Sequence, residues 1–314
     1  MAIKKNIKKA TKTTIKKAAA KAVTKLNTMR VFWCRPQLFF LCLVFTFTHI
    51  SGAQSSDGKL IGTAGLNQIE GTGGGGIVPW ATLAGYDSQE QISVNAFTTE
   101  VHLEDYRLNV LGVSASFYDR IEVSVVQHRF DLKTLGGEIK QNIYGLKYRL
   151  YGDVVYSTWP QVSIGLQHKK LHDGSIAAAL GAINSSSGTD IYLAATKIHL
   201  GALFGFNTVW SVTARATKAN QLGLLGFSGV NNDNYQIMAE ASAAVLFSRH
   251  LAVGIEYRQK PDNLGLGEDD WLDVFISYIP NKDLSLTLAW AELGSIAGAE
   301  KQQGLYLSLN GQLW

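Results

Sequence analysis

Residues Tyr235–Phe247 read YQIMAEASAAVLF, and the side chains alternate in character along them. Every odd position is apolar, whereas the polar residues Gln236, Glu240 and Ser242 all occupy even positions. A repeat of two places successive side chains on opposite faces of a β-strand, while a helix would need a repeat of 3.6. The stretch therefore predicts a strand with one apolar and one polar face.

The same alternation recurs along the chain after Gln54. It is clear at 251–258, 272–278 and 284–290, and similar runs cover 77–86, 91–103, 107–117, 121–130, 140–150, 161–171, 190–200, 204–216 and 305–313. These make 13 clear runs, and Lys59–Ile69 is a natural fourteenth. No apolar run approaches the roughly 18 residues of a transmembrane helix. We expect an all-β fold of 12 to 14 strands.

Short and long connections alternate between these runs. The short connections are 87–90, 118–120, 201–203, 248–250 and 280–283. Most of the connections that alternate with them, such as 172–189, 217–234 and 261–269, are longer and polar. Such asymmetry is typical of an up-and-down meander with one plain and one elaborated end. A closed barrel of this kind with both termini at the plain end has an even strand number.

Alternation alone does not say which face meets water. A lipocalin-like barrel buries its apolar face inside, whereas a membrane barrel turns it to lipid. The runs are mostly as long as the ~9–11 residues that cross the hydrocarbon layer, aromatic residues gather near their ends, and the chain stops on Trp314. These features favour a closed antiparallel transmembrane β-barrel over residues 54–314. One detail disagrees, because Leu305, Leu307, Leu309 and Leu313 share a face that excludes Trp314; a β-bulge would repair this.

The first 53 residues differ from the rest. They hold 11 of the 29 Lys and Arg residues and no Asp or Glu. Residues 29–53 have the basic start, short apolar core and small-residue end of a signal peptide, with cleavage expected after Ala53. Residues 1–28 form a Lys/Ala-rich basic extension, which we interpret as an over-long leader start or a start codon assigned upstream of Met29.

The body has an acidic balance, with 18 basic and 25 acidic residues. This argues against nucleic-acid binding, which requires a basic face. Both cysteines, Cys34 and Cys42, precede the body, which excludes a disulfide or a thiolate metal site there.

Several segments resemble a known family. They are LNQIEGTGGGGIVPWA (66–81), LEDYRLNVLG (103–112), YDRIEVS (118–124), ATKANQLGLLGFSG (216–229), LAVGIEYRQKPDNLG (251–265), EDDWLDVF (268–275) and LSLTLAWAELG (284–294). Over about 57–313 the chain resembles the bacterial domain-of-unknown-function 3034 family. The resemblance implies an exported outer-membrane barrel of Gram-negative bacteria; it transfers no catalytic residue, because the family has no established activity.

Few residues suggest chemistry. The glycine tract 71–76 (GTGGGG) lacks the Lys-Ser/Thr of a phosphate loop and is interpreted as a flexible loop between the first two strands. His168 and His172 would stand ~13 Å apart on a strand, too far to share a metal ion. Ser228 in GFSG does not complete a Gly-x-Ser-x-Gly motif. An outer-membrane lipid hydrolase could use His128, His168 or His199 as base, but we expect no enzyme, no metal and no cofactor.

Charged side chains also occur on the polar faces of the strands. Lys or Arg facing lipid at mid-depth costs about 2–4 kcal/mol, so we expect these residues to line a lumen. The predicted lumen-lining residues are Glu122, Lys147, Arg149, Lys197, Arg215, Glu240, Glu256, Arg258 and Asp273. In a wet lumen they would form a mixed-charge pore wall, and in a narrow one they would pair into a structural plug.

The sequence thus predicts an outer-membrane barrel, with a porin-like channel for small polar solutes as the first functional hypothesis. The alternatives are a closed structural or adhesion barrel acting through the loops at 172–189, 217–234 and 261–269, and the hydrolase. Expected partners are outer-membrane lipid and lipopolysaccharide, the barrel-assembly machinery and, in a homo-oligomer, further copies of the chain.

Overall fold

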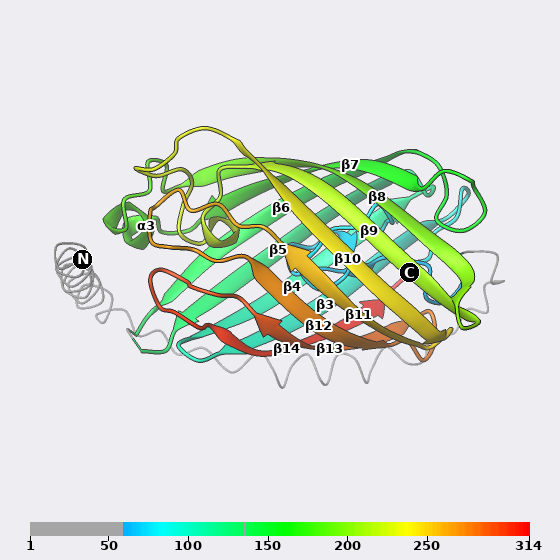
Figure 1. The fold of residues 1–314 in the computed structure, drawn as a ribbon. Coiled ribbons are helices and arrows are strands. Elements are labelled where there is room, and N and C mark those ends of the chain that lie inside the picture. The colour runs from blue at the N-terminus through cyan, green and yellow to red at the C-terminus, as the bar shows by residue number, and fades with distance from the viewer. Residues whose placement is uncertain (1–58, 135) are drawn as a thin grey trace.

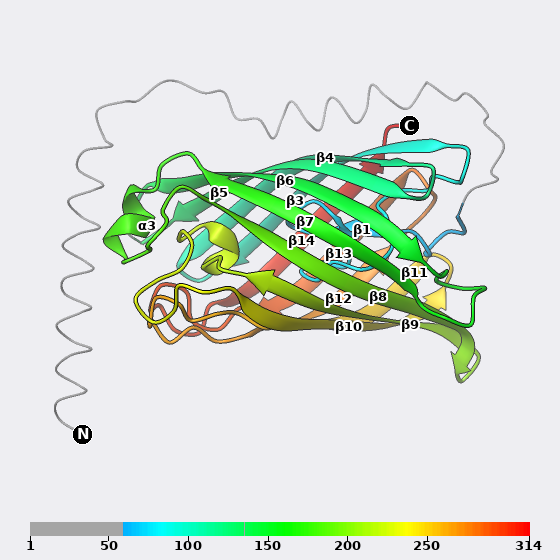
Figure 2. The ribbon, with the colours of Figure 1, turned by 90° about the horizontal axis from the view of Figure 1, so that it is seen from above.

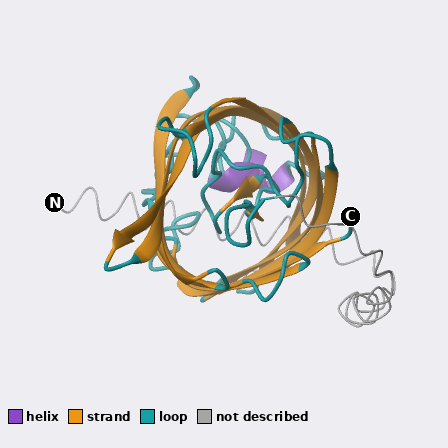
Figure 3. Cartoon of the chain, turned by 90° about the vertical axis from the view of Figure 1, so that its right-hand side faces the viewer, coloured by secondary structure: helices purple, strands orange, loops and turns teal. Residues whose placement is uncertain are grey.

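Twelve antiparallel strands form a closed barrel in the computed structural model, which describes residues 59–134 and 136–314 (Figures 1 and 3). The strands are β3 (Ile92–Leu103), β4 (Tyr106–Phe117), β5 (Ile121–Leu132), β6 (Glu138–Tyr151), β7 (Gln161–Leu171), β8 (Ser187–Leu203), β9 (Phe206–Thr217), β10 (Gln236–Ser248), β11 (Leu251–Arg258), β12 (Trp271–Tyr278), β13 (Leu284–Glu292) and β14 (Gln303–Gln312). The predicted all-β up-and-down barrel is confirmed. The predicted extension at 1–28, signal peptide at 29–53 and both cysteines lie outside the described residues.

Each strand pairs with its neighbours in sequence, and β14 returns to β3 to close the ring, with Leu309 opposite Thr98. Closure satisfies the backbone amides of every strand within the sheet and leaves no open edge. The connections 118–120, 152–160, 204–205, 249–250 and 279–283 define the short-turn end. The connections 104–105, 133–137, 172–186, 218–235, 259–270 and 293–302 define the long-loop end, where α3 (Ser175–Ala179) lies (Figure 1).

The burial pattern shows which face is apolar. On β13, Leu284, Leu286 and Leu288 are 37%, 41% and 44% exposed, whereas the intervening Ser285 and Thr287 are 5% and 3% exposed. The same alternation runs along β12 and β14. The apolar side chains therefore face outward, which is the arrangement of a transmembrane barrel and the reverse of a lipocalin. Within the described ranges no helix is long and apolar enough to cross a membrane.

Two predicted strands are absent from the barrel. Residues 59–69 and 77–86 were expected to join the sheet, but residues 64–86 fold inside the lumen (Figures 2 and 3). There β1 (Leu66–Asn67) pairs with β2 (Gly73–Gly74), and isolated bridges join Gly65 to Ala84 and Gly74 to Pro79. We call residues 64–86 the insert. The glycine tract 71–76 belongs to it and is not a loop between two barrel strands. Pro79 has no backbone N–H to donate, and five of the six residues from Gly71 to Gly76 are glycine. This segment is therefore poorly suited to the hydrogen-bond ladder of a sheet.

The C-terminus contains a β-bulge of the kind that would repair the register of Trp314. The amides of Leu313 and Trp314 both donate to the Val94 carbonyl, at 2.7 and 3.2 Å, and the Val94 amide donates to the Trp314 carbonyl at 2.8 Å. Two residues thus oppose one, which shifts the register by one position. Both Leu313 and Trp314 are exposed as a result.

Candidate functional site

The insert fills the middle of the barrel. Gln68, Glu70, Val78, Ala81, Leu83 and Ala84 are all 0% exposed. Lys59 lies 2.6 Å from Asp87 and 3.0 Å from Asp119 in a short turn, and β3 begins just beyond, at Ile92. The insert therefore enters and leaves the lumen at the short-turn end. The sequence left open whether the lumen is wet or is narrow and filled by paired charges; in the structure the insert occupies it.

Glu122 and Lys147 hold one side of the insert. The Glu122 carboxylate accepts hydrogen bonds from the amides of Gly73 and Ala84, at 3.0 and 2.6 Å, and from the Thr72 hydroxyl at 2.5 Å. The Lys147 ammonium donates to the carbonyls of Gly73 and Thr82, at 2.7 and 2.8 Å. The wall residues thus bind mainly the backbone of the insert, through charge-assisted hydrogen bonds.

Glu256 holds the glycine tract from the other side. Its Oε2 accepts hydrogen bonds from the amides of Gly76 and Ile77, at 2.6 and 2.7 Å. A Cβ on Gly75 would lie 1.9 Å from Glu256 Oε1, so no other residue fits there without displacing the carboxylate. The glycines allow the backbone to approach the wall closely.

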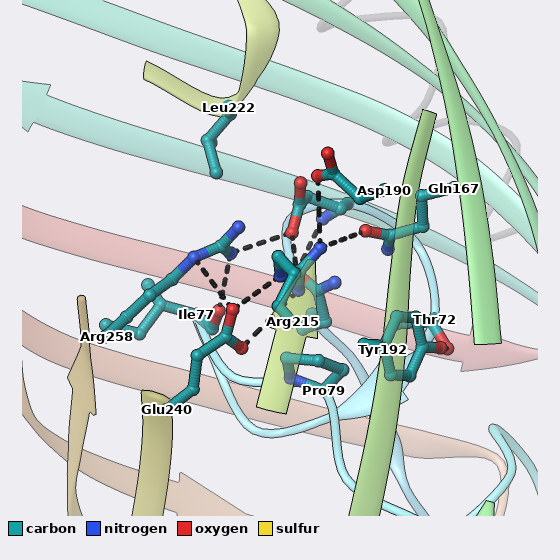
Figure 4. Close-up of polar contacts among 12 residues, drawn as sticks. Thr72, Ile77, Pro79, Gln167, Asp190, Tyr192, Arg215, Leu222, Glu240 and Arg258 are labelled. Atoms are coloured by element: carbon teal, nitrogen blue, oxygen red, sulfur yellow. Dashed lines mark hydrogen bonds and ion pairs between the residues drawn. The ribbon is translucent and has the colours of Figure 1, made fainter. Parts of the chain in front are cut away.

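Glu70 of the insert lies at the centre of a buried ion network, of which Figure 4 labels Asp190, Arg215, Glu240 and Arg258. Its carboxylate is 2.5 Å from Lys169 Nζ, 2.7 Å from an Arg258 nitrogen and 3.3 Å from an Arg215 nitrogen. Asp190 pairs with Lys169 at 2.6 Å, and Glu240 pairs with Arg215 and Arg258. Three cations and three carboxylates, none more than 6% exposed, therefore balance one another. A buried network of this kind is favourable only while every member is paired.

Neutral polar side chains of the wall complete the contacts. They bond mostly to backbone groups of the insert: Thr196 to the Ala81 amide, Gln161 and Ser163 to the Ala81 carbonyl, Thr213 to the Pro79 carbonyl, Asn310 to the Asn67 amide, and His128 to the Ile69 carbonyl. The insert is thus held around the barrel circumference by hydrogen bonds and ion pairs.

The long loops close the other end of the lumen. In the β9–β10 connection, which contains η1 (Gln221–Gly223), Leu222, Leu224 and Leu225 are buried in an apolar cluster with Ile69 and Ile77 of the insert. An apolar layer thus lies between the central charges and the long loops.

The structure places eight of the nine predicted lumen-lining residues in three groups. Glu122, Lys147, Arg215, Glu256 and Arg258 contact the insert directly. Glu240 acts through the two arginines, and Asp273 lies opposite Glu256 in the β11–β12 register. Arg149 lies at the short-turn rim, paired with Asp119.

Lys197 is a correction. It shares the outward face of β8 with Ile191 and Leu193, and its ammonium donates to carbonyls of the β6–β7 connection, including Asp153 and Val155. This connection covers Lys197, which is only 7% exposed although it does not line the lumen.

Sequence reasoning missed Glu70, Lys169 and Asp190. Lys169 and Asp190 continue the inward alternation of their strands, at the ends of the predicted runs, so the period of two could have found them. Glu70 could not be predicted as a luminal residue, because the segment around it was interpreted as a strand followed by a loop.

The residues considered for other chemistry are separated. His128 contacts the Ile69 carbonyl, His168 the Thr189 hydroxyl and His199 the Trp210 indole. Among residues 59–134 and 136–314, no group of three His, Cys, Asp or Glu side chains could hold a metal ion.

Comparisons with known proteins find a matching family model and several similar solved structures. A family model described as "Protein of unknown function (DUF3034)" matches residues 63–310. No curated protein is detectably similar in sequence. Similar solved structures include the KdgM porin (10% identity, TM-score 0.45, 69% of this chain and 98% of that one), the outer membrane protein Omp33 of Acinetobacter baumannii (8%, 0.42, 72% and 100%) and the COG4313 outer membrane channel from Pseudomonas putida F1 (11%, 0.40, 70% and 95%). The TM-scores lie below 0.5, so nothing about function is inferred from them.

Proposed function

The chain belongs to the DUF3034 family, and we propose that it is an outer-membrane channel for small polar solutes, closed in this state by its own N-terminal insert. The observation that carries the proposal is that the luminal wall binds the insert through polar contacts to its backbone, at Glu122, Lys147 and Glu256. If the insert moves aside, these charged residues line an open, hydrated lumen.

The topology supports a movable insert. It enters and leaves at one end, so it can shift toward the short-turn side without threading through the barrel. Charge-assisted hydrogen bonds exchange readily with water once water can enter, whereas a tightly packed apolar core does not separate without exposing apolar surface.

The location follows from the outward apolar face, which requires lipid. We propose insertion in the outer membrane with the short-turn end in the periplasm, after export by the signal peptide and with help from the barrel-assembly machinery. The long loops would then face lipopolysaccharide.

Conductance in planar bilayers tests the channel. The wild-type protein should remain mostly closed, and the double variant Glu122→Gln/Glu256→Gln should show stepwise openings, because both wall carboxylates that hold insert amides lose their charge. Glu104→Gln is the matched control, since Glu104 is exposed in the β3–β4 connection. In an open variant, neutralising Arg149 should change the size of the open level.

The main alternative is the closed structural or adhesion barrel. Silence from the wild type, the double variant and a variant lacking residues 64–86, all shown to be folded, would contradict the channel and favour this alternative. Hydrolysis of phospholipid by purified protein would instead favour the enzyme hypothesis.

A further inference from the structure

The Glu70 carboxylate occupies a cradle made entirely by the barrel wall. Lys169 on β7, Arg215 on β9 and Arg258 on β11 come from three strands and converge on this one group. Glu70 is the only one of the network's members that belongs to the insert; the others would stay in place if the insert moved.

Removal of Glu70 leaves the cradle unbalanced. The wall alone contributes three cations against Asp190 and Glu240, an excess of one positive charge at a site no more than 6% exposed. The three cations are held close together and repel one another, and two carboxylates do not balance them, so the open state gains from a monoanion that replaces Glu70.

A cavity adjoins the cradle. It is lined by all three cations of the cradle and by Lys260, Trp271 and Leu222. Arg258 and Lys260 lie over the Trp271 ring, 5.7 and 5.8 Å from its centre. The cavity lining therefore combines cations with the apolar surface of Trp271 and Leu222, which suits an anion with an organic part better than an inorganic ion.

We propose that this cradle is a binding site for small organic monocarboxylates, and that Glu70 is its built-in competitor. The inference rests on the proposed movement of the insert and names the solute class of the channel. Arginine nitrogens from two strands and one lysine reproduce around the solute the contacts that Glu70 receives here, and the single excess charge matches one carboxylate. A dianion would leave one negative charge unpaired.

Chemical rescue tests the site without requiring conduction. Glu70→Ala removes the carboxylate that the cradle binds, and propionate supplies a carboxylate of the same kind, so the thermal unfolding temperature of the detergent-solubilised variant should rise with propionate concentration. Propionamide and sodium chloride at equal ionic strength should act only at about ten-fold or higher concentration. If the variant folds only with propionate present, folding yield against concentration reports the same binding.

Two variants control for nonspecific effects. Glu70→Gln removes the same charge but keeps the cradle filled, so propionate should not rescue it. Glu70→Ala/Arg258→Gln should bind propionate about ten-fold more weakly or not at all, because one of the three donors is lost.

The inference is overturned if chloride or propionamide rescues Glu70→Ala as well as propionate does, or if propionate leaves the unfolding temperature and folding yield unchanged. If propionate stabilises Glu70→Ala but no form of the protein conducts, the carboxylate site stands and the channel function is contradicted. If the insert variants conduct but propionate does not stabilise Glu70→Ala, the channel function stands and the carboxylate site is contradicted.

Discussion

At the scale of single residues, two neighbouring wall carboxylates should respond in opposite directions to loss of charge. Glu256 accepts two amide hydrogen bonds from the insert, whereas neither carboxylate oxygen of Asp273 has a hydrogen-bond partner among the described residues. The two lie opposite each other in register, and like charges so placed repel. Asp273→Asn should stabilise the barrel by about 1 kcal/mol, since the new amide can also donate to the unpartnered Glu256 Oε1.

The matched change at Glu256 should be unfavourable. Glu256→Gln weakens two charge-assisted bonds and should cost about 1–3 kcal/mol. Chemical unfolding of both variants in the same detergent measures the difference. If both substitutions lower the free energy of unfolding, Asp273 has a partner that the structure does not show.

Gly73 supplies a second residue-scale prediction. A Cβ there would lie 2.5 Å from the Ala84 amide nitrogen and 2.7 Å from the Thr82 carbonyl oxygen, both backbone atoms. Gly73→Ala should destabilise the protein by about 1–3 kcal/mol and speed hydrogen exchange at the insert. Gly311→Ala is the control, because its nearest contact would be 3.9 Å away. If Gly73→Ala leaves the stability unchanged, the insert tolerates displacement at β2.

Most of the wall residues of the site could be predicted, because alternation with a period of two assigns each strand residue to a face. It failed at Lys197, where a connection from elsewhere in the chain covers a polar residue on the outward face. Such coverage is a tertiary contact, which strand periodicity does not contain. Pairing partners were also beyond prediction, since Glu70 meets Arg258 across 188 residues of sequence.

At the scale of elements, all twelve barrel strands were predicted and the insert was not. Residues 77–86 alternate as the true strands do, but alternation is a local property, and whether a segment finds a neighbouring strand depends on the closure of the whole ring. Once β14 pairs with β3, no edge remains for a further strand. The segment then satisfies its backbone with wall side chains and with other backbone groups of the insert instead of a barrel ladder.

The long loops form a second element whose closure can be tested. Glu268 pairs with Lys260 at 2.8 Å, accepts from the Ala297 amide at 3.1 Å and also bonds Gln221, so it links the β9–β10, β11–β12 and β13–β14 connections. Burial raises the pKa of Glu268 and lowers the pKa of Lys260, while each charge favours the other. Glu268→Gln leaves the lysine without its countercharge.

We expect Glu268→Gln to loosen these loops and increase protease cleavage within 218–235 and 259–270 several-fold, with the barrel intact. Glu300→Gln, an exposed change in the β13–β14 connection, should leave cleavage as in the wild type. Unchanged cleavage in Glu268→Gln would show that apolar packing of Leu222, Leu224 and Leu225 closes the mouth without the ion pair.

At the scale of the whole molecule, the lumen is layered along the barrel axis. Neutral polar side chains such as Asn95, Ser285 and Asn310 lie toward the short turns, the charged network lies at the centre, and apolar residues such as Leu103 and Leu293 lie below the long loops. A solute that crosses would have to displace both the insert and the loop layer. The loop layer packs on Ile69 and Ile77 of the insert, so displacement of the insert also removes the support of the loop layer.

The last prediction concerns the outward apolar face of the barrel, which should contact lipid. Leu288 lies midway along β13 and is 44% exposed, so it should contact acyl chains; Val230, 80% exposed, lies in the β9–β10 connection. An arginine at mid-depth on the lipid face costs about 2–4 kcal/mol. Leu288→Arg should therefore lower the unfolding free energy in bilayers by that amount, while Val230→Arg changes it little. Both substitutions add the same charge to an exposed apolar position. Equal changes in the unfolding free energy would therefore mean that the outward face of β13 does not lie in the hydrocarbon layer. The membrane assignment on which the channel depends would then fail.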